Sequence, residues 1–136
     1  MKKIKVLLSL VLCLVLLTAC GGGDVRRVQC NAGPSKVYAE LEIRKAMDTV
    51  ADYFKKEFDG CTLIRLEYDE SRVEAAQAEW AAQYGADQAI VLLSEFAVDS
   101  SGGDGSLNPD SIYRNWKWVL VRNGGGAWEL KTWGYG

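Results

Sequence analysis

The sequence predicts an α+β domain whose helices come mainly before an antiparallel meander. A long segment with helical periodicity is followed by segments whose apolar residues alternate as in strands. A second helical segment separates the first two strands, and the C-terminal third has the pattern of a hairpin. The expected order of elements is α-β-α-β-β-β, with the long helix at the N-terminal side of the domain.

The long helix is expected over about 40–58, because its apolar residues fall on one helical stripe. These are Ile43, Ala46, Met47, Val50, Ala51, Phe54 and Phe58. Ser35 and Ala39 are both possible N-caps. Gly60 suits a left-handed cap and ends the helix.

A strand is expected over 62–68, with Ile64, Leu66 and Tyr68 on one face and Leu63 on the other. Ser71 then starts the second helix as its cap, and Gly85 stops it. The apolar side of this helix consists of Val73, Ala76, Trp80 and Tyr84.

The segment 89–98 is apolar nearly throughout, which predicts a central strand covered on both faces. A polar loop over 99–111 leads to a hairpin of 112–122 with 127–135, turning at the glycine-rich 123–126. The expected register pairs Val121 with Trp128, Val119 with Leu130, Trp118 with Lys131, Trp116 with Trp133 and Arg114 with Tyr135.

The N-terminus has the pattern of a secretory signal, with lysines at the start and an aliphatic run over 6–17. This run is too short to span a bilayer. It ends in Leu17-Thr18-Ala19-Cys20, which resembles the lipobox of bacterial lipoproteins. The resemblance implies that 1–19 is a signal peptide and that Cys20 carries acyl chains such as palmitate. The alternative is a plain secreted protein in which this cysteine is incidental.

The expected organisation is therefore a signal over 1–19, a lipid anchor with a flexible tether over 20–37, and one α+β domain over 38–136. Gly21, Gly22 and Gly23 form the tether in this interpretation. The protein is expected on the outer face of the bacterial cell membrane, held by the lipid on Cys20.

The composition of the mature chain excludes several classes of function. Removing the signal takes three lysines and no acids, which leaves 13 basic and 18 acidic residues and a net charge of −5. Nucleic acid is therefore not an expected partner. The chain has no histidine, so Ser-His-Asp and Cys-His catalysis and histidine-ligated zinc are excluded. No cofactor is expected.

Two thiols remain once Cys13 has left with the signal and Cys20 is acylated. A bridge between Cys30 and Cys61 would stabilise the fold by about 3.5 kcal/mol in the chain-entropy model. The sequence favours this bridge slightly over two free thiols.

Three segments together resemble a family of small lipoproteins from Gram-positive gut bacteria that carry a domain of unknown function. They are 53–63 with Tyr68-Asp69-Glu70, then 80–92, and the hairpin of 116–122 with Trp128-Glu129. The resemblance covers about residues 38–136. It implies a nuclear-transport-factor-2-like or cystatin-like cone, in which a curved antiparallel sheet wraps a long helix. It implies no activity.

Three hypotheses for a site follow from the residues. The loop places Asp99, Ser101 and Asp110 at ligand positions 1, 3 and 12 of the EF-hand pattern, but it lacks the glycine that the pattern requires. An ordinary hairpin loop is the alternative to a calcium site. In the hairpin, Trp116, Trp118, Trp133 and Tyr135 with Arg114 and Lys131 predict a surface for a protein, peptide or glycan ligand. The alternative is that this face covers the long helix.

The third hypothesis is an enzyme, because cone folds include ketosteroid isomerase, which uses Asp and Tyr without histidine. Glu95 lies between apolar neighbours on the long strand and is the best candidate for a catalytic carboxylate. Its alternative role is that of a partner for Arg or Lys. A binding or interaction module is the preferred function, and an isomerase- or hydrolase-type enzyme is the alternative.

Overall fold

The computed structural model describes residues 21–135. It has seven elements: β1 (Gln29–Ala32), α2 (Glu40–Glu57), β2 (Cys61–Tyr68), α3 (Glu70–Gln83), β3 (Gln88–Val98), β4 (Ile112–Arg122) and β5 (Glu129–Gly134). The signal peptide over 1–19 and the candidate lipidation site Cys20 lie outside the described residues. Within 21–135, no helix has both the length and the apolar character needed to cross a membrane.

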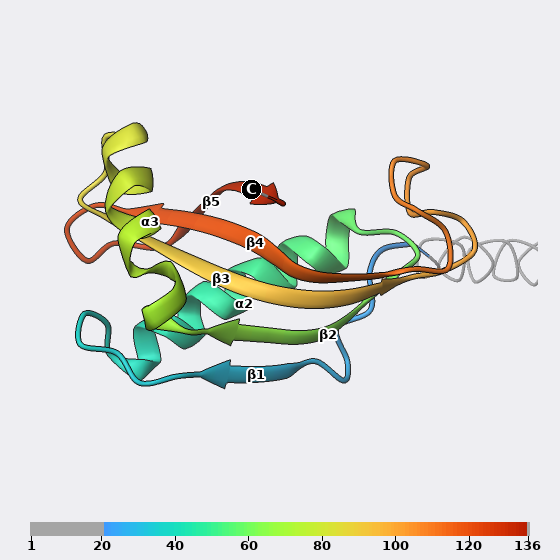
Figure 1. The fold of residues 1–136 in the computed structure, drawn as a ribbon, viewed down its shortest axis with the longest axis horizontal. Helices are drawn as coiled ribbons and strands as arrows, with labels where there is room; N and C mark the ends of the chain where they lie inside the picture. The colour runs from blue at the N-terminus through green and yellow to red at the C-terminus, as the bar shows by residue number, and fades with distance from the viewer. Residues whose placement is uncertain (1–20, 136) are drawn as a thin grey trace, which may run out of the picture.

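The five strands form one sheet in the order β1-β2-β3-β4-β5 (Figure 1). The strands from β2 to β5 are antiparallel neighbours, as predicted, and β3 is central. The fold is α+β, but the expected order α-β-α-β-β-β omitted β1, which makes the sheet mixed by pairing in parallel with β2. Its sequence, Gln-Cys-Asn-Ala, is short and largely exposed and shows no apolar alternation.

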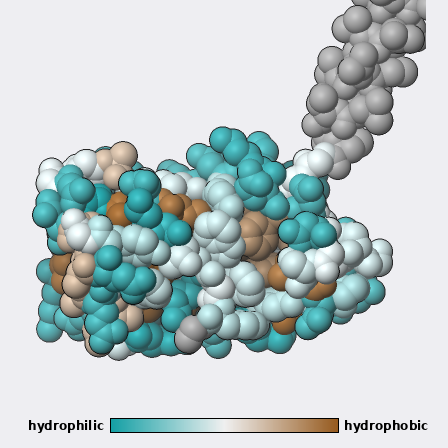
Figure 2. Space-filling view, turned by 90° about the horizontal axis from the view of Figure 1, so that it is seen from above, coloured by the Kyte–Doolittle hydropathy of each residue, from teal (hydrophilic) through white to brown (hydrophobic). Residues whose placement is uncertain are grey.

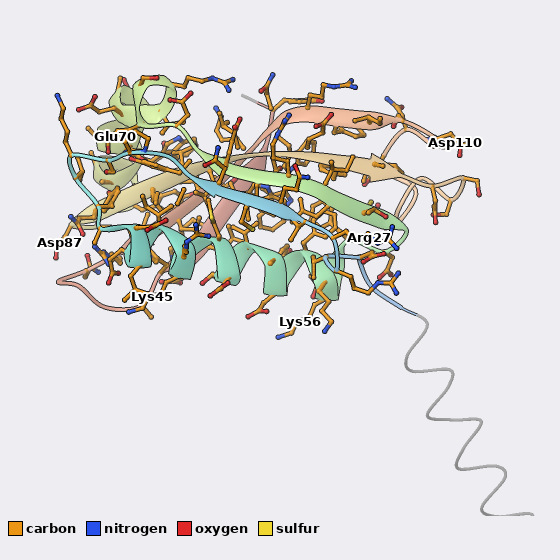
Figure 3. The ribbon with its side chains drawn as sticks, turned by 90° about the horizontal axis from the view of Figure 1, so that it is seen from below. Arg27, Lys45, Lys56, Glu70, Asp87 and Asp110 are labelled. Carbon is orange, nitrogen blue, oxygen red and sulfur yellow. The ribbon has the colours of Figure 1, made fainter. Side chains whose placement is uncertain are left out.

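The helix α2 lies along one face of the sheet, and α3 lies on the other side at one end (Figures 1 and 3). The predicted stripe of α2 is the buried one, with Ile43, Ala46, Met47, Val50 and Phe54 in the core. Ala39 is the N-cap and offers no side-chain hydrogen bond. Gly60, with a φ of +72°, takes the predicted left-handed conformation just after the helix.

The second helix begins two residues earlier than the N-cap predicted at Ser71. Asp69 is the N-cap, and the Ser71 hydroxyl donates to the Asp69 carboxylate instead of capping a backbone N–H. Val73 is buried as expected, but the other buried residue is Gln77. Its side chain reaches the edge of β3, where its Oε1 accepts from the Val91 backbone N–H at 3.0 Å.

Each of the three antiparallel ladders contains an irregularity of one extra residue. Ile64 is extra in β2, so Leu63 turns into the core. Arg114 and Asn115 in β4 together oppose Glu95, and Asn115 has a positive φ of 57°. Lys131 is extra in β5. Because side chains alternate along a strand, each extra residue exchanges the faces of everything beyond it.

The residues expected to form a flexible tether are packed against the domain. The backbone N–H groups of Gly22 and Gly23 donate to the Asp59 carboxylate at 2.7 Å and to the Lys55 carbonyl at 2.9 Å. A Cβ atom on Gly23 would lie 2.5 Å from the Phe54 carbonyl oxygen. Asp24 then pairs with β2 at Thr62. These glycines are required for close approach, so the prediction of a tether over 20–37 is wrong from Gly22 onwards.

Candidate functional site: an aromatic and acidic pocket at the end of α2

The predicted hairpin forms, but its register is shifted. The structure pairs Trp118 with Trp133, Val119 with Thr132 and Leu120 with Leu130. Trp128 precedes β5 and packs into the core, where its Nε1 donates to the Glu42 carbonyl. The turn is therefore longer than the two or four residues that the sequence suggested, and the predicted pairs of Trp116, Trp118 and Arg114 are wrong.

The four aromatic residues of the hairpin nevertheless lie on one side, facing α2. Trp133 contacts Tyr53 with ring centroids 4.8 Å apart, and Trp118 lies 5.3 Å from Phe58. Trp118 is 0% exposed, so it cannot belong to a ligand surface, whereas Trp133 is 39% and Tyr135 62% exposed. Tyr135 packs on Trp116 at 5.3 Å. Much of this face covers the long helix, which was the alternative interpretation.

The two basic residues expected beside these aromatics point elsewhere. Arg114, displaced by the bulge, forms an ion pair with Glu95 at 3.0 Å, and Arg65 approaches the same carboxylate at 3.0 Å. Lys131 lies over the ring of Tyr84, which follows α3, at 5.8 Å. Glu95 is therefore a partner of two arginines, which agrees with its alternative, structural role. The geometry gives it no free oxygen for catalysis.

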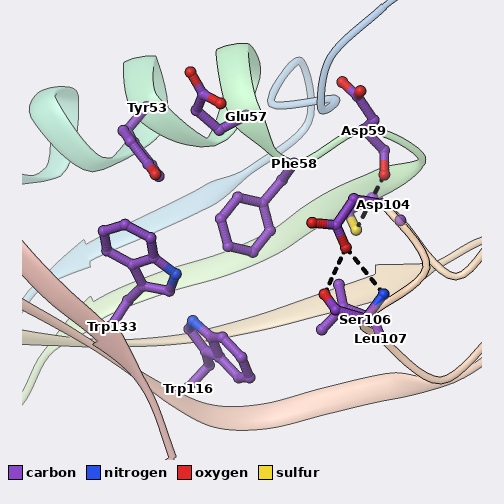
Figure 4. Close-up of a pocket in the computed structure, with 11 residues that line it drawn as sticks. Tyr53, Glu57, Phe58, Asp59, Asp104, Ser106, Leu107, Trp116 and Trp133 are labelled. Atoms are coloured by element: carbon purple, nitrogen blue, oxygen red, sulfur yellow. Dashed lines mark hydrogen bonds between the residues drawn. The ribbon is translucent and has the colours of Figure 1, made fainter.

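A cavity of about 240 Å³ opens where the exposed edge of this aromatic cluster meets the end of α2 (Figure 4). Tyr53, Glu57 and Phe58 line it from the helix side, and Trp116 and Trp133 line it from β4 and β5. Asp59, which follows α2, Cys61, at the start of β2, and the loop after β3 contribute the rest of the wall. Figure 2 shows that apolar surface is exposed only in small areas between hydrophilic residues on the face it presents. The aromatic rings and the carboxylates of its lining give the cavity apolar walls and a polar rim, as in small-molecule sites.

The indole of Trp116 supplies an unused hydrogen-bond donor in this cavity. Its Nε1 is buried and has no hydrogen-bond partner in the described part of the chain. Figure 4 shows this nitrogen directed towards the space between Trp133 and Phe58. Trp118, two residues along the same strand, differs: its Nε1 donates to Ser94 Oγ at 2.7 Å. A buried N–H without an acceptor is costly and uncommon in folded proteins.

The charged groups that line the cavity are all acidic: Glu57, Asp59 and Asp104. One oxygen of Asp104 accepts from the backbone N–H of Ser106 at 3.0 Å and from its hydroxyl, and these bonds lower the pKa of Asp104. Burial, followed by the charges of Asp99, Asp104 and Asp59, raises the pKa of the Cys61 thiol in the wall to about 11. The thiol therefore stays protonated at neutral pH.

The loop after β3 is held by its own side chains. Asp99 Oδ1 accepts from the backbone N–H and the hydroxyl of Ser101, which lowers the pKa of Asp99. The backbone N–H of Asp110 donates to the Asp99 carbonyl. Residues 21–135 contain no group of three or more His, Cys, Asp or Glu side chains arranged to hold a metal ion. Asp99, Ser101 and Asp110 thus act as loop-forming residues in this geometry.

The cysteine pair predicted to form a bridge is kept apart by the sheet. Cys30 pairs with Leu66 in the β1–β2 register, five residues from Cys61 in the same strand. At about 3.3 Å per residue, this separation is far beyond the span of a disulfide. Cys30 is an exposed free thiol and Cys61 a buried one, so the predicted bridge is wrong.

Comparison of the chain with protein-family models, curated proteins and solved structures found no match.

Sequence reasoning found Trp116 and Trp133 but missed the residues that complete the pocket. Tyr53 and Glu57 come from α2, and Asp104 comes from the loop after β3. One signal was present: Tyr53 and Glu57 are four residues apart on α2 and flank the buried stripe next to Phe58. The position of Asp104 depends on how the loop folds back towards Asp59, which the sequence does not indicate.

Proposed function

We propose that this protein is a lipid-anchored, extracytoplasmic binding module whose ligand enters the pocket between α2 and the β4–β5 hairpin. The observation that carries the proposal is the buried Nε1 of Trp116, a residue of the cavity wall, which has no hydrogen-bond partner within residues 21–135. A ligand oxygen that accepts this N–H would satisfy the buried donor, and the rings of Tyr53 and Trp133 would provide stacking area.

The cone architecture and membership of the small-lipoprotein family are parts of the same proposal. Their support is that α2 lies along one face of a sheet in which β2 to β5 are antiparallel neighbours (Figure 3). The location rests on the lipobox-like Leu17-Thr18-Ala19-Cys20. The isomerase- or hydrolase-type alternative has less support, because both oxygens of Glu95 have arginine partners.

The packed glycines give the anchor a geometric consequence. A single residue, Gly21, separates Cys20 from Gly22, whose N–H is bound to the pocket residue Asp59. A lipid attached at Cys20 would therefore be joined to the packed part of the domain by only two residue steps of about 3.8 Å each. In this proposal the rim of the pocket lies beside the bilayer surface instead of at the far end of a flexible tether.

The location is tested by substituting Cys20. Replacing Cys20→Ser should abolish incorporation of labelled palmitate and should reduce the membrane-bound fraction of the protein. Cys13→Ser is the matched control, because this cysteine leaves with the signal and its replacement should change neither result. Retention of the label by the Cys20→Ser protein would contradict the proposal.

The pocket is tested through the indole resonances of the intact lipoprotein, labelled with ¹⁵N-tryptophan and held in a polyoxyethylene detergent. Choline, N-acetylglucosamine and diglycine are suitable probes. At least one of them should shift the Trp116 Nε1–H resonance in a saturable way. The Trp118 resonance is an internal control, since its hydrogen bond to Ser94 should persist. If no probe shifts Trp116 selectively, the binding site is not at this pocket.

A further inference from the structure

Charge narrows the class of ligand that the pocket can take. Within the described part of the chain, its lining contains three carboxylates, those of Glu57, Asp59 and Asp104, and no lysine or arginine. The ion pairs formed within residues 21–135 include none of these three carboxylates. The negative charge at the rim is therefore not neutralised by neighbouring basic side chains at contact distance. An anionic ligand would be repelled from such a rim, and a cation attracted.

The end of α2 adds to this field. The helix closes at Phe58, which lines the pocket, so its carbonyl end faces this region and carries partial negative charge. Lys55 and Lys56 belong to the last turn and line a neighbouring hollow that shares Asp59 with the pocket, whereas Glu57 and Asp104 line the pocket and not that hollow. The raised pKa of Cys61, to which Asp99, Asp104 and Asp59 contribute after burial, is consistent with a negative potential at the wall.

The aromatic walls favour an organic cation over a metal ion. Tyr53 and Trp133 lie at 4.8 Å with their planes tilted by 48°, and Trp116 meets Phe58 nearly perpendicularly at 6.5 Å. Rings that surround a space from several directions bind alkylammonium groups through cation–π attraction, with tryptophan the strongest partner. A hydrated metal ion would gain little from these apolar faces, because hard cations select oxygen ligands.

We propose that the pocket binds a small organic ammonium that also carries a hydrogen-bond-accepting oxygen. The ammonium lies in the cavity against the aromatic rings of its wall, near Glu57 and Asp104, and the oxygen accepts the Nε1–H of Trp116. This inference rests on the proposed function, since it assigns a ligand class to the same pocket. The cavity of about 240 Å³ suits a compact ligand, as it is smaller than most sites for drug-sized molecules.

The test compares choline with 3,3-dimethylbutan-1-ol, which has the same shape and hydroxyl but a carbon in place of the charged nitrogen. Both are titrated into the ¹⁵N-tryptophan-labelled lipoprotein while the Trp116 resonance is followed. Choline should bind with a millimolar or lower dissociation constant, and the neutral alcohol at least about tenfold more weakly, from the loss of cation–π and charge attraction. Equal binding of the two, or absence of choline binding, would overturn the assignment.

Isosteric variants show which carboxylates of the pocket attract the ammonium group. Glu57→Gln and Asp104→Asn should each weaken choline binding several-fold and leave the alcohol unaffected. Asp48→Asn is the matched control, because Asp48 is an exposed acid on the same helix outside the pocket lining. An unchanged Trp118 resonance checks that each variant is folded. If choline binding survives the combined Glu57→Gln and Asp104→Asn substitution, the cation assignment is wrong.

The outcomes separate this inference from the proposed function. Selective shifts with N-acetylglucosamine or diglycine but not with choline would keep the binding pocket and reject the cation. Silence of Trp116 towards every probe would reject both.

Discussion

Polar side chains near the two ends of α2 differ in whether their hydrogen-bonding groups have partners. Beyond its N-terminal end, the Tyr68 hydroxyl donates to Glu70 and accepts from Gln77, while Glu70 also accepts from Ser35 and from the Lys36 N–H. Near its C-terminal end, Trp116 has a buried N–H with no partner among residues 21–135. Glu70 and Asp110 mark these opposite ends of the molecule in Figure 3. A network that satisfies its own members serves stability, and in the proposed function a ligand supplies the acceptor that the Trp116 donor lacks among residues 21–135.

The largest effect should come from a matched pair of Trp→Phe substitutions in β4. Trp118→Phe removes a buried indole and its hydrogen bond to Ser94, and should lower the free energy of unfolding by about 2–3 kcal/mol. Trp116→Phe removes an N–H that has no partner, and should cost about 1 kcal/mol or less. Urea unfolding measures both. Equal losses would mean that the Trp116 donor is satisfied in solution.

The hydrogen-bonded network near the N-terminal end of α2 is tested by substituting Gln77. Gln77→Leu keeps the side-chain size but leaves the Val91 N–H buried without an acceptor, and should cost about 2 kcal/mol. Gln83→Leu is the control, because Gln83 is exposed at the end of the same helix and its replacement should fall within about 0.5 kcal/mol. If Gln77→Leu unfolds at the same urea concentration as the control, the network does not contribute to stability as described.

The glycines beside the pocket offer a comparison with a smaller expected effect. Gly23→Ala would bring its Cβ atom within 2.7 Å of the Phe54 ring and should cost about 1–2 kcal/mol through local displacement. Gly21→Ala is the control, since a Cβ atom there meets nothing within 4 Å. Thermal unfolding should separate the two variants. A neutral Gly23→Ala would show that Gly22 and Gly23 are not held against α2 in solution, and would restore the flexible tether.

The sequence predicted what depends on long, regular patterns. The stripe from Ile43 to Phe58 identifies α2 because seven apolar positions follow one period. The apolar run over 89–98 identifies β3 because only a central strand is buried on both faces. The element β1 was missed because its four residues gain order from pairing with β2 and not from a pattern of their own.

The pocket was harder to predict because single-residue insertions control it. The extra residue near Asn115 turns Arg114 away from Trp116 and towards Glu95, and the extra Lys131 shifts Trp133 to face Trp118. A bulge is stabilised by its neighbours across the sheet, so the strand's own sequence does not show it. The glycines at 22 and 23 carried the same ambiguity, since glycine permits both a loose linker and close packing.

Alkaline pH should lower the free energy of unfolding through buried groups near both ends of α2, and the pH range differs between the two ends. Burial is the main cause that raises the pKa of Cys61 from 9 to about 11 and that of Tyr68 from 10 to about 12. Each group keeps its proton in the folded state where the unfolded chain has lost it. Stability is therefore complete below the unfolded pKa and decreases as the pH rises, over about 9–11 for Cys61 and about 10–12 for Tyr68.

Two variants separate these contributions in urea titrations from pH 8 upwards. Cys61→Ala should remove the earlier decrease at the pocket end and leave the later one. Tyr68→Phe should lower stability at pH 8 by breaking the contacts with Glu70 and Gln77, yet flatten the pH dependence above 10. An unchanged slope above pH 10 in Tyr68→Phe would show that the buried hydroxyl does not control the alkaline limit. The alkaline decrease would then come from the other groups within residues 21–135 whose pKa burial raises, which are Cys30, Tyr38, Tyr53 and Cys61.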